Sequence, residues 1–586
     1  MIKESYTGRS VLNSLSNNKS ASITALELIA LGCIWVLMAL LVNPTGEFPL
    51  NDDWSFSRAV QSLIDHGRLQ FTGLDSMTLI AQVFWGALFC LPFGFSFTAL
   101  RLSTLVLGLV GIFVTYGLFR EVKTNRTTAL LAALTVAINP LYFELSFTFM
   151  TDVPFFAFSM LSILFLMRGI RQESNIELLA GNLFVCLAIL IRQLGIIIPL
   201  SFGIAYLAKN GVTRKTLQTA LLPIVLSVGI LIAYQIWMQS TTGLSPLYNR
   251  GYDSIFESST GFLQAIKLLF YRFLVELVYL GLFTLPFLII LTINKWKTAS
   301  HRGRLLSVLT SSGFFVAVMG ALIWKNRTMP LSGNVLFDIG LGPATLRDVY
   351  NLGLPHLSNA PKALWLVITT AGAFGGALML RYLFSALAQV LLKLSKFESI
   401  ADKWPLILFL SACTSYSVLI GVIGFFDRYL IPLLPLSMIA MITTGNSFKL
   451  RVSRSPVFIA AVLLFVYGFF ALGATHDYLS WNRSRWKALH YLMEEAHISY
   501  KNIDGGYEFN GWYSFDAKYR VNPSKSWWWV DNDDYIISFG PMIGYSEMKR
   551  YPYKRWIPFG QGNIFVLHRL ADSKASESAL DENPLQ

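Results

Sequence analysis

Long apolar runs separated by short polar segments fill most of the first 475 residues of the chain. A helix that crosses a membrane needs about 20 predominantly apolar residues. The pattern predicts 14 candidate segments: 23–43, 77–95, 99–119, 127–143, 153–168, 176–191, 194–208, 217–238, 271–293, 305–324, 361–382, 405–425, 429–444 and 455–473. This arrangement is typical of a polytopic α-helical membrane protein.

The basic segments indicate which of these runs cross the membrane, because cytoplasmic loops carry an excess of Lys and Arg. If 77–95 is a surface or partly embedded helix, every basic segment falls on the side of the basic amino terminus: REVKTNR (120–126), RGIR (168–171), KNGVTRK (209–215), KWKTASHRGR (295–304), LLKLSKFESIADK (391–403) and KLRVSR (449–454). Thirteen spans then remain. The amino terminus is predicted to be cytoplasmic and the carboxyl-terminal region external, in a multi-pass protein of the cytoplasmic membrane.

The composition agrees with this class, since 54% of residues are hydrophobic and only 14% are charged. The net charge of +13 comes from short clusters between apolar runs, so it indicates membrane topology and not nucleic-acid binding. The four cysteines lie within apolar segments, without metal-site or disulfide spacing.

The chain divides into four predicted parts. Residues 1–22 form a cytoplasmic segment, and 23–475 form the membrane domain, with external loops at 44–98, 144–152, 239–270 and 325–360. Residues 476–570 contain WNRSRW, YEFNGWY and the strand-like runs YIISF and NIFVLHRL, which predict a small external α/β domain. The polar tail 571–586 is predicted to be disordered. The Trp and Tyr residues of this region could bind carbohydrate, form a core or line the membrane interface.

Two adjacent acids open the first external loop, in NDDWSFSRAVQSLIDHG (51–67). Apolar residues after Asp52 and Asp53 recur at helical spacing and Gly67 ends the run, which predicts an amphipathic helix on the membrane surface. An acid at a helix amino terminus is often only a cap. One cap needs one side chain, however, and here there are two acids and Asn51.

Further charged residues are predicted on the same face. Asp152 precedes Pro154 at the start of a span, where it could be a helix cap, and Glu144 lies in the same loop. Arg58, Arg192 and Arg428 also lie on the external side. An arginine at a span boundary is often an anchor at the membrane surface. Three of them beside paired acids favour an anion site, because a guanidinium binds phosphate through several donors.

The motifs NDDWSFSRAVQSLIDHG, MTDVP, IRQLG and DRYLIPLLP resemble those of the GT-C glycosyltransferases, in the branch that includes protein O-mannosyltransferases and the lipid A aminoarabinose transferase. The resemblance runs from about residue 23 to 475. In this family an acidic pair opens a surface helix whose terminal glycine lies fifteen residues after the first acid, as Gly67 does after Asp52. Some relatives have an arginine where this chain has Ser55, so the role of Arg58 is less well supported.

The resemblance implies a GT-C fold and an activity. The enzyme would transfer a sugar from a polyprenyl-phosphate donor to a hydroxyl of a lipid, glycan or protein acceptor at the external face, with inversion. Asp52 would be the general base, with Asp53 and Asp152 orienting the acceptor or Asp52 itself. Arg192, Arg428 and Arg58 would bind the donor phosphate.

Other residues are candidates for substrate binding: Glu144, Tyr350, His356 and Tyr429. Tyr350 and His356 lie in the long loop 325–360, which could close over a substrate or be an ordinary surface loop. Mg²⁺ or Mn²⁺ could bind Asp52, Asp53 and Asp152, although no ligand cluster requires a metal.

Three other functions stay open from the sequence. A transporter or flippase of lipid-linked sugars would place ionisable residues at mid-membrane, often within internal repeats, and no repeat is evident. A polymerase or ligase of GT-C type would use similar chemistry on a larger donor. A non-catalytic carbohydrate-binding protein would explain the aromatic tail but not the paired acids.

Overall fold

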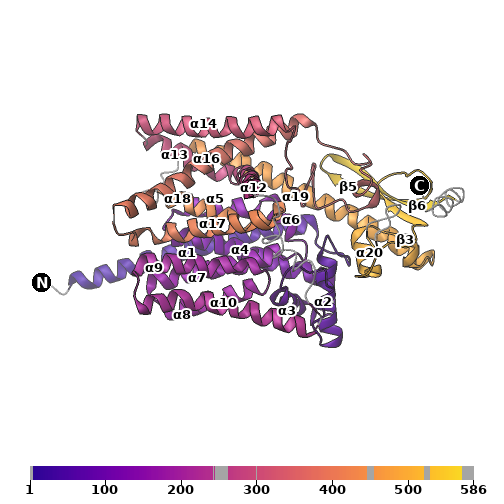
Figure 1. Ribbon diagram of the computed structural model, residues 1–586, viewed down its shortest axis with the longest axis horizontal. Helices are drawn as coiled ribbons and strands as arrows, with labels where there is room; N and C mark the ends of the chain where they lie inside the picture. Colours follow the sequence, from indigo (N-terminus) through magenta and orange to yellow (C-terminus); the bar gives the residue numbers. More distant parts are fainter. Residues whose placement is uncertain are drawn as a thin grey trace.

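The computed structural model describes residues 4–241, 243, 262–298, 300–396, 398–444, 454–520 and 528–570. Most of these residues are helical, and the long helices run side by side in a bundle. The amino terminus lies beyond one end of the bundle and the carboxyl-terminal domain beyond the other (Figure 1). The expected class, a polytopic helical protein with a small carboxyl-terminal domain, is confirmed.

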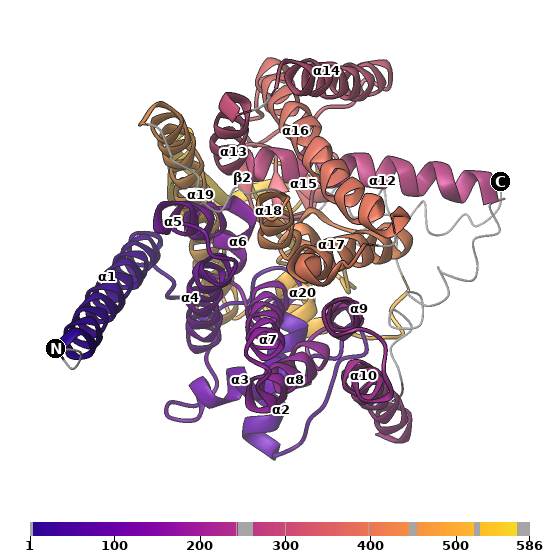
Figure 2. The same ribbon diagram turned by 90° about the vertical axis from the view of Figure 1, so that its left-hand side faces the viewer.

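Eight helices in the described part of the chain are long and apolar enough to cross a membrane. They are α1 (Glu4–Val42, apolar over Ile23–Val42), α4 (Phe97–Glu121), α7 (Asp152–Gln172), α10 (Arg214–Thr241), α14 (His301–Trp324), α16 (Lys362–Ser395), α17 (Trp404–Ile423) and α19 (Arg454–His490). Seen along the bundle, α1, α10 and α14 lie at its edge (Figure 2). Their mostly exposed apolar side chains suit contact with lipid.

The expected span 271–293 is divided into two helices. α12 (Phe262–Phe283) and α13 (Leu285–Thr298) meet at 82°, so together they give a ninth span or a re-entrant segment. Four further expected spans form shorter helices: α5 (Arg126–Ala137), α8 (Asn175–Ile189), α9 (Ile197–Asn210) and α18 (Leu433–Ile442). All thirteen expected segments are thus helical, but four are shorter than a typical span.

Glycines allow α12 and α16 to cross in close contact. A Cβ on Gly281 would lie 2.0 Å from the Gly376 nitrogen, and one on Gly375 would lie 2.2 Å from the Gly281 oxygen. No side chain fits at such distances, so the crossing requires glycine on both helices. This contact fixes α12 against the bundle just before its bend.

Short elements gather at the end of the bundle that contacts the carboxyl-terminal domain. They are α2 (Asp53–His66), α3 (Ile80–Cys90) and α6 (Pro140–Leu145). α2 buries its apolar face and ends at Gly67, whose left-handed conformation lets its N–H donate to the Leu63 carbonyl. The 11-residue α3 corresponds to the segment 77–95, and its length agrees with a surface or partly embedded helix.

The carboxyl-terminal domain has a four-stranded sheet in the order β3-β4-β6-β5. Its strands are β3 (Ile503–Asp504), β4 (Tyr535–Ser538), β5 (Tyr545–Trp556) and β6 (Phe559–Arg569), and α20 (Tyr507–Ser514) follows β3. β4 and β6 confirm the two predicted strand runs. α19 continues through the predicted boundary at 475 and leads directly into the domain.

The segment 325–360, which the sequence predicts to be external and which we call the external segment, contains little regular structure. It forms a two-residue ladder, β1 (Leu336–Phe337) with β2 (Gly340–Leu341), and the short helix α15 (Arg347–Tyr350). The predicted disordered tail, 571–586, and most of the predicted loop 239–270 lie outside the described residues.

Candidate active site

Asp52 lies directly before α2 and does not act as its cap. Its side chain makes no hydrogen bond to the free amides of the helix. Instead one carboxylate oxygen lies 3.3 Å from Arg428 Nη2, and the other accepts a hydrogen bond of 2.8 Å from the Tyr507 hydroxyl. The side chain is 34% exposed. The carboxylate is therefore fixed by two donors and still open to a ligand.

Asp53 is buried and organises the local backbone. Its two oxygens accept hydrogen bonds from the Leu50 amide at 2.6 Å and the Phe149 amide at 3.0 Å. Burial raises the pKa of Asp53 to about 7, although these amides and the charge of Arg101 oppose the shift. Asp53 thus joins the start of α2 to the loop before α7 and does not point to the exposed side of the site.

Asp152 and two arginines form a buried cluster beside Asp52. Asp152 Oδ1 lies 3.0 Å from Arg192 Nη2, and its Oδ2 lies 4.0 Å from Arg428 Nε. Arg192 also donates to the Thr151 hydroxyl at 2.6 Å. The Arg192 guanidinium lies over the ring of Tyr429 at 4.8 Å. Four residues predicted from separate external turns, Asp52, Asp152, Arg192 and Arg428, are therefore in one network.

Some guanidinium N–H groups of this network have no hydrogen-bond partner among the described residues. Within the described residues, Arg428 Nε and Nη1 and Arg192 Nη2 make no hydrogen bond, although Arg192 Nη2 and Arg428 Nε form ion pairs with Asp152. Burial alone would lower the pKa of Arg428, but Asp152 and Asp52 raise it above its ordinary value. Arg428 is therefore a permanent buried cation with open donor positions, as anion binding requires.

Glu144 lies close to the same cluster, and α6 carries it. Its side chain is buried, and Oε2 has no hydrogen-bond partner among the described residues. Burial, together with the charge of Asp427, raises the pKa of Glu144 well above its ordinary value. The unpartnered carboxyl oxygen of Glu144 adds hydrogen-bonding capacity to the cluster.

Arg58 lies elsewhere. Its guanidinium donates to the Trp512 carbonyl and lies 5.7 Å from the centre of the Trp54 ring and 5.6 Å from that of Trp512. It makes no ion pair within the described part of the chain, so the structure does not bring it together with Arg192 and Arg428.

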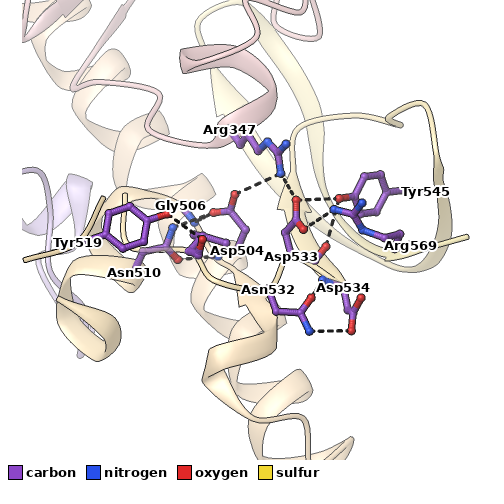
Figure 3. Close-up of polar contacts among 12 residues, drawn as sticks. Arg347, Asp504, Gly506, Asn510, Tyr519, Asn532, Asp533, Asp534, Tyr545 and Arg569 are labelled. Atoms are coloured by element: carbon purple, nitrogen blue, oxygen red, sulfur yellow. Dashed lines mark hydrogen bonds and ion pairs between the residues drawn. The ribbon is translucent and has the colours of Figure 1, made fainter. Parts of the chain in front are cut away.

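The external segment that carries Tyr350 and His356 is bound to the carboxyl-terminal domain. Arg347, at the start of α15, pairs with Asp533 and lies 4.0 Å from Asp504 (Figure 3). The neighbouring Asp348 accepts a hydrogen bond of 2.7 Å from the Phe539 amide. Tyr350 is thereby held near Asp52 and is 48% exposed; burial and the charge of Asp52 raise its pKa.

His356 is not part of the Asp52 network. Its Nε2 lies 3.8 Å from Asp348 Oδ2, and its ring packs against Gly540. The structure thus places His356 within the contact between the external segment and the carboxyl-terminal domain.

Two residues of the carboxyl-terminal domain complete the site, and sequence reasoning missed both. Burial and the charge of Asp52 raise the pKa of Tyr507 well above its ordinary value, so the phenol keeps the proton that it donates. The adjacent Glu508 accepts from the Asn51 amide at 3.0 Å and from Arg485 Nη1 at 2.7 Å. The only sequence signal was the aromatic run YEFNGWY, which does not indicate a contact with the first loop.

The three acids considered as metal ligands are not gathered around one point. Asp53 is engaged by backbone amides, whereas Asp52 and Asp152 face arginines. Among the described residues no group of three or more His, Cys, Asp or Glu side chains could hold a metal ion. The cluster is suited to binding an anion beside a carboxylate.

Fold and site together define a multi-pass membrane protein with a carboxylate and two buried arginines at one end of its helix bundle. The sequence profile of the dolichyl-phosphate-mannose-protein mannosyltransferase family matches residues 81–238. This match confirms, over those residues, the resemblance indicated by the sequence motifs. The matched range includes Asp152 and Arg192. No curated protein matches the chain.

Among solved structures, the chain is similar to ArnT from Cupriavidus metallidurans. The crystal structure of ArnT bound to undecaprenyl phosphate has 11% sequence identity and a TM-score of 0.39, over 93% of this chain and 98% of that chain. The apo crystal structure of ArnT has 13% identity and a TM-score of 0.34, over 82% of this chain and 81% of that chain.

Proposed function

We propose that the chain is a membrane glycosyltransferase that transfers a sugar from a polyprenyl-phosphate donor to an acceptor hydroxyl at the external face of the cytoplasmic membrane. One observation carries the proposal: the partly exposed Asp52 carboxylate lies between Tyr507 and Arg428, directly beside the buried arginine cluster. The matched family profile supports the choice of donor class, since its name describes a dolichyl-phosphate mannose donor.

Asp52 acts as the general base. The acceptor hydroxyl oxygen forms a bond to the anomeric carbon while its proton moves to the Asp52 carboxylate. The bond between the anomeric carbon and the phosphate oxygen breaks in the same step, and polyprenyl phosphate leaves with the electron pair. A single displacement of this kind inverts the anomeric configuration and needs one base.

Arg428 and Arg192 stabilise the leaving phosphate. Negative charge grows on the phosphate oxygens in the transition state. The two guanidinium groups have N–H donors that make no hydrogen bond among the described residues and could bind these oxygens. Asp152 lies 3.0 Å from Arg192 and 4.0 Å from Arg428, so it holds both in place. Asp53 acts through the backbone that positions Asp52, and Arg58 has no assigned part in phosphate binding.

The test compares wild type with Asp52→Asn, purified in detergent, on a panel of polyprenyl-phosphate sugars. Release of polyprenyl phosphate is followed with and without acceptor, and donor binding is followed by thermal shift. We expect turnover to fall about a hundredfold or more in the variant while donor binding persists, because only the proton acceptor is lost.

The matched control is Asp516→Asn, which alters an exposed aspartate in the carboxyl-terminal domain and should turn over like wild type. Equal turnover in Asp52→Asn and wild type would remove Asp52 as the base. If neither protein consumes donor, but sealed vesicles containing either one move it across the bilayer, the protein is a transporter and the proposal is wrong.

A further inference from the structure

A row of aromatic rings passes beside Asp52 and joins three parts of the chain. Neighbouring ring centres lie 5.0 Å apart for Tyr350 and Trp528, 5.1 Å for Trp528 and Tyr507, 6.0 Å for Tyr507 and Trp529, and 5.1 Å for Trp529 and Phe515. We call these five residues the aromatic row. All five are at least partly exposed. Trp54, whose ring packs against those of Tyr507, Trp529 and Phe515, is fully buried.

The row ends at a polar cavity between α2 and α20. The cavity has a volume of about 590 Å³, and Phe515 belongs both to the row and to its wall. Most of its other lining side chains are polar, and several are planar: Arg58, Gln61, Asp65, His66 and Gln70, beside Trp512. Such side chains donate and accept hydrogen bonds in one plane, as neighbouring hydroxyls of a sugar ring require.

The base lies at the middle of the row. Tyr507, its third ring, donates to Asp52 at 2.8 Å, so a molecule lying on the adjacent rings has its polar groups close to this carboxylate. Sugar rings suit such a surface, because their C–H bonds carry partial positive charge and the faces of aromatic rings are negative.

We propose that the aromatic row and the polar cavity bind the acceptor, and that the acceptor is a glycan. This inference rests on the proposed function and names its acceptor class. Sugar units stack on Tyr350 and Trp528, the hydroxyl to be glycosylated faces Asp52, and further units extend over Phe515 into the cavity. The proton and leaving-group steps are those of the proposed transfer.

The surroundings favour a glycan over the other acceptors. An extended peptide is commonly bound along a free strand edge. The row contains no strand: it is built from α15, from α20 with the following Phe515, and from the two residues 528–529. A lipid would need an apolar channel, whereas the cavity at the end of the row has mostly polar side chains.

The experiment uses full-length protein and a donor that it consumes. Acceptors are neutral tetrasaccharides of glucose, mannose and N-acetylglucosamine, compared with a Ser/Thr-rich peptide. Tyr350→Ala and Trp528→Ala should raise the acceptor KM for a saccharide about tenfold with a much smaller change in kcat. Tyr350→Phe and Trp528→Phe keep an aromatic face and should raise the acceptor KM much less than the Ala variants do.

The matched control is Tyr500→Ala. Tyr500 is 37% exposed and packs against another aromatic ring, that of Tyr513 at 5.7 Å, but it lies outside the row. It should leave the acceptor KM unchanged. A wild-type KM in both row Ala variants would overturn the inference, and so would transfer to the peptide without transfer to any saccharide.

A measurement of saccharide binding without donor tests this inference independently of the proposed function. Saturation-transfer NMR with the same tetrasaccharides reports contact with the protein without any donor. Saccharide binding that is lost in Trp528→Ala and kept in Tyr500→Ala supports the glycan site even if no donor is consumed. Donor turnover without saccharide binding or transfer supports the proposed function and overturns the glycan site.

Discussion

Asp52 and Asp53 are neighbours in the chain, but their surroundings are opposite. Asp52 faces a cation and a phenol and is partly exposed, whereas Asp53 is buried and accepts hydrogen bonds from two backbone amides. Successive residues of a helix point about 100° apart, so the side chains of two adjacent acids at its start point to different surroundings. The pair therefore places one carboxylate where the proposed chemistry needs a base and the other where it holds the loop.

The burial of Asp53 predicts a pH dependence of stability. Folding raises the pKa of Asp53 from 3.8 to about 7, so the folded state binds this proton more tightly than the unfolded state does. Stability from this group is present at low pH and is lost as pH rises from about 4 to about 7. Asp53→Asn cannot titrate, so wild type should lose on the order of a few kcal/mol relative to the variant over this range.

The measurement is thermal unfolding of both proteins in detergent between pH 5 and 8. Asp75 and Asp348, whose pKa values burial raises to about 6 and about 7, add slopes of the same sign, so only the difference between wild type and variant is diagnostic. Asp402→Asn is the control, since Asp402 is exposed and Lys393 lowers its pKa. If the unfolding temperatures of wild type and Asp53→Asn change with pH in parallel, the prediction is contradicted.

Individual site residues could be predicted from the sequence where membrane topology constrains them. Four residues lie at the ends of apolar runs on one predicted face, and the structure joins them: Asp52, Asp152, Arg192 and Arg428. Tyr507 could not be predicted in this way. It meets Asp52 across 455 positions of the chain, and no local periodicity encodes such a contact.

At the scale of elements, the apolar pattern predicted where helices occur but not where a helix is interrupted. The run 271–293 looks continuous, yet α12 ends at Phe283 and α13 begins at Leu285 with a bend of 82°. Pro286, in the first turn of α13, was the signal for a new helix start. β5 was missed because Pro552 and several charged residues are atypical of a central strand, but they suit the edge position that it holds.

The contact between the external segment and the carboxyl-terminal domain depends on Arg347. This arginine is buried and pairs with Asp533, close to Asp504 (Figure 3). Removing one partner of an isolated buried pair costs about 3–5 kcal/mol. Asp533 keeps its ion pair with Arg569, so we expect a smaller loss here. Arg347→Met should still lower the unfolding temperature, and it should also weaken saccharide binding because α15 carries Tyr350.

Arg550→Met is the matched control, because Arg550 pairs with Glu547 on the exposed surface of the same domain. Exposed pairs contribute little, so this variant should unfold like wild type in the same thermal scan. Equal unfolding temperatures for Arg347→Met and Arg550→Met would show that the Arg347 contact does not hold the segment.

At the scale of the whole molecule, the bundle and the carboxyl-terminal domain share one site. Glu508 accepts hydrogen bonds from the Asn51 amide, the Thr345 hydroxyl and Arg485, and so connects the first loop, the external segment and α19. A Cβ on Gly511 would lie 2.4 Å from the Trp54 ring, so the domain packs directly on α2. The sequence predicted both parts but not this contact, which depends on how the two fold against each other.

The orientation of the protein in the membrane decides which side of the membrane the shared site faces. The distribution of basic segments predicts that the Asp52 end and the carboxyl-terminal domain face outward. Two exposed residues report the two sides: Lys123, in a basic segment, and Phe559, the first residue of β6. Single Lys123→Cys and Phe559→Cys variants, made after replacing the four native cysteines, should react oppositely with an impermeant maleimide. In intact spheroplasts the reagent should label position 559 at once and position 123 only after permeabilisation. The reverse labelling would place Asp52 in the cytoplasm and would exclude transfer at the external face.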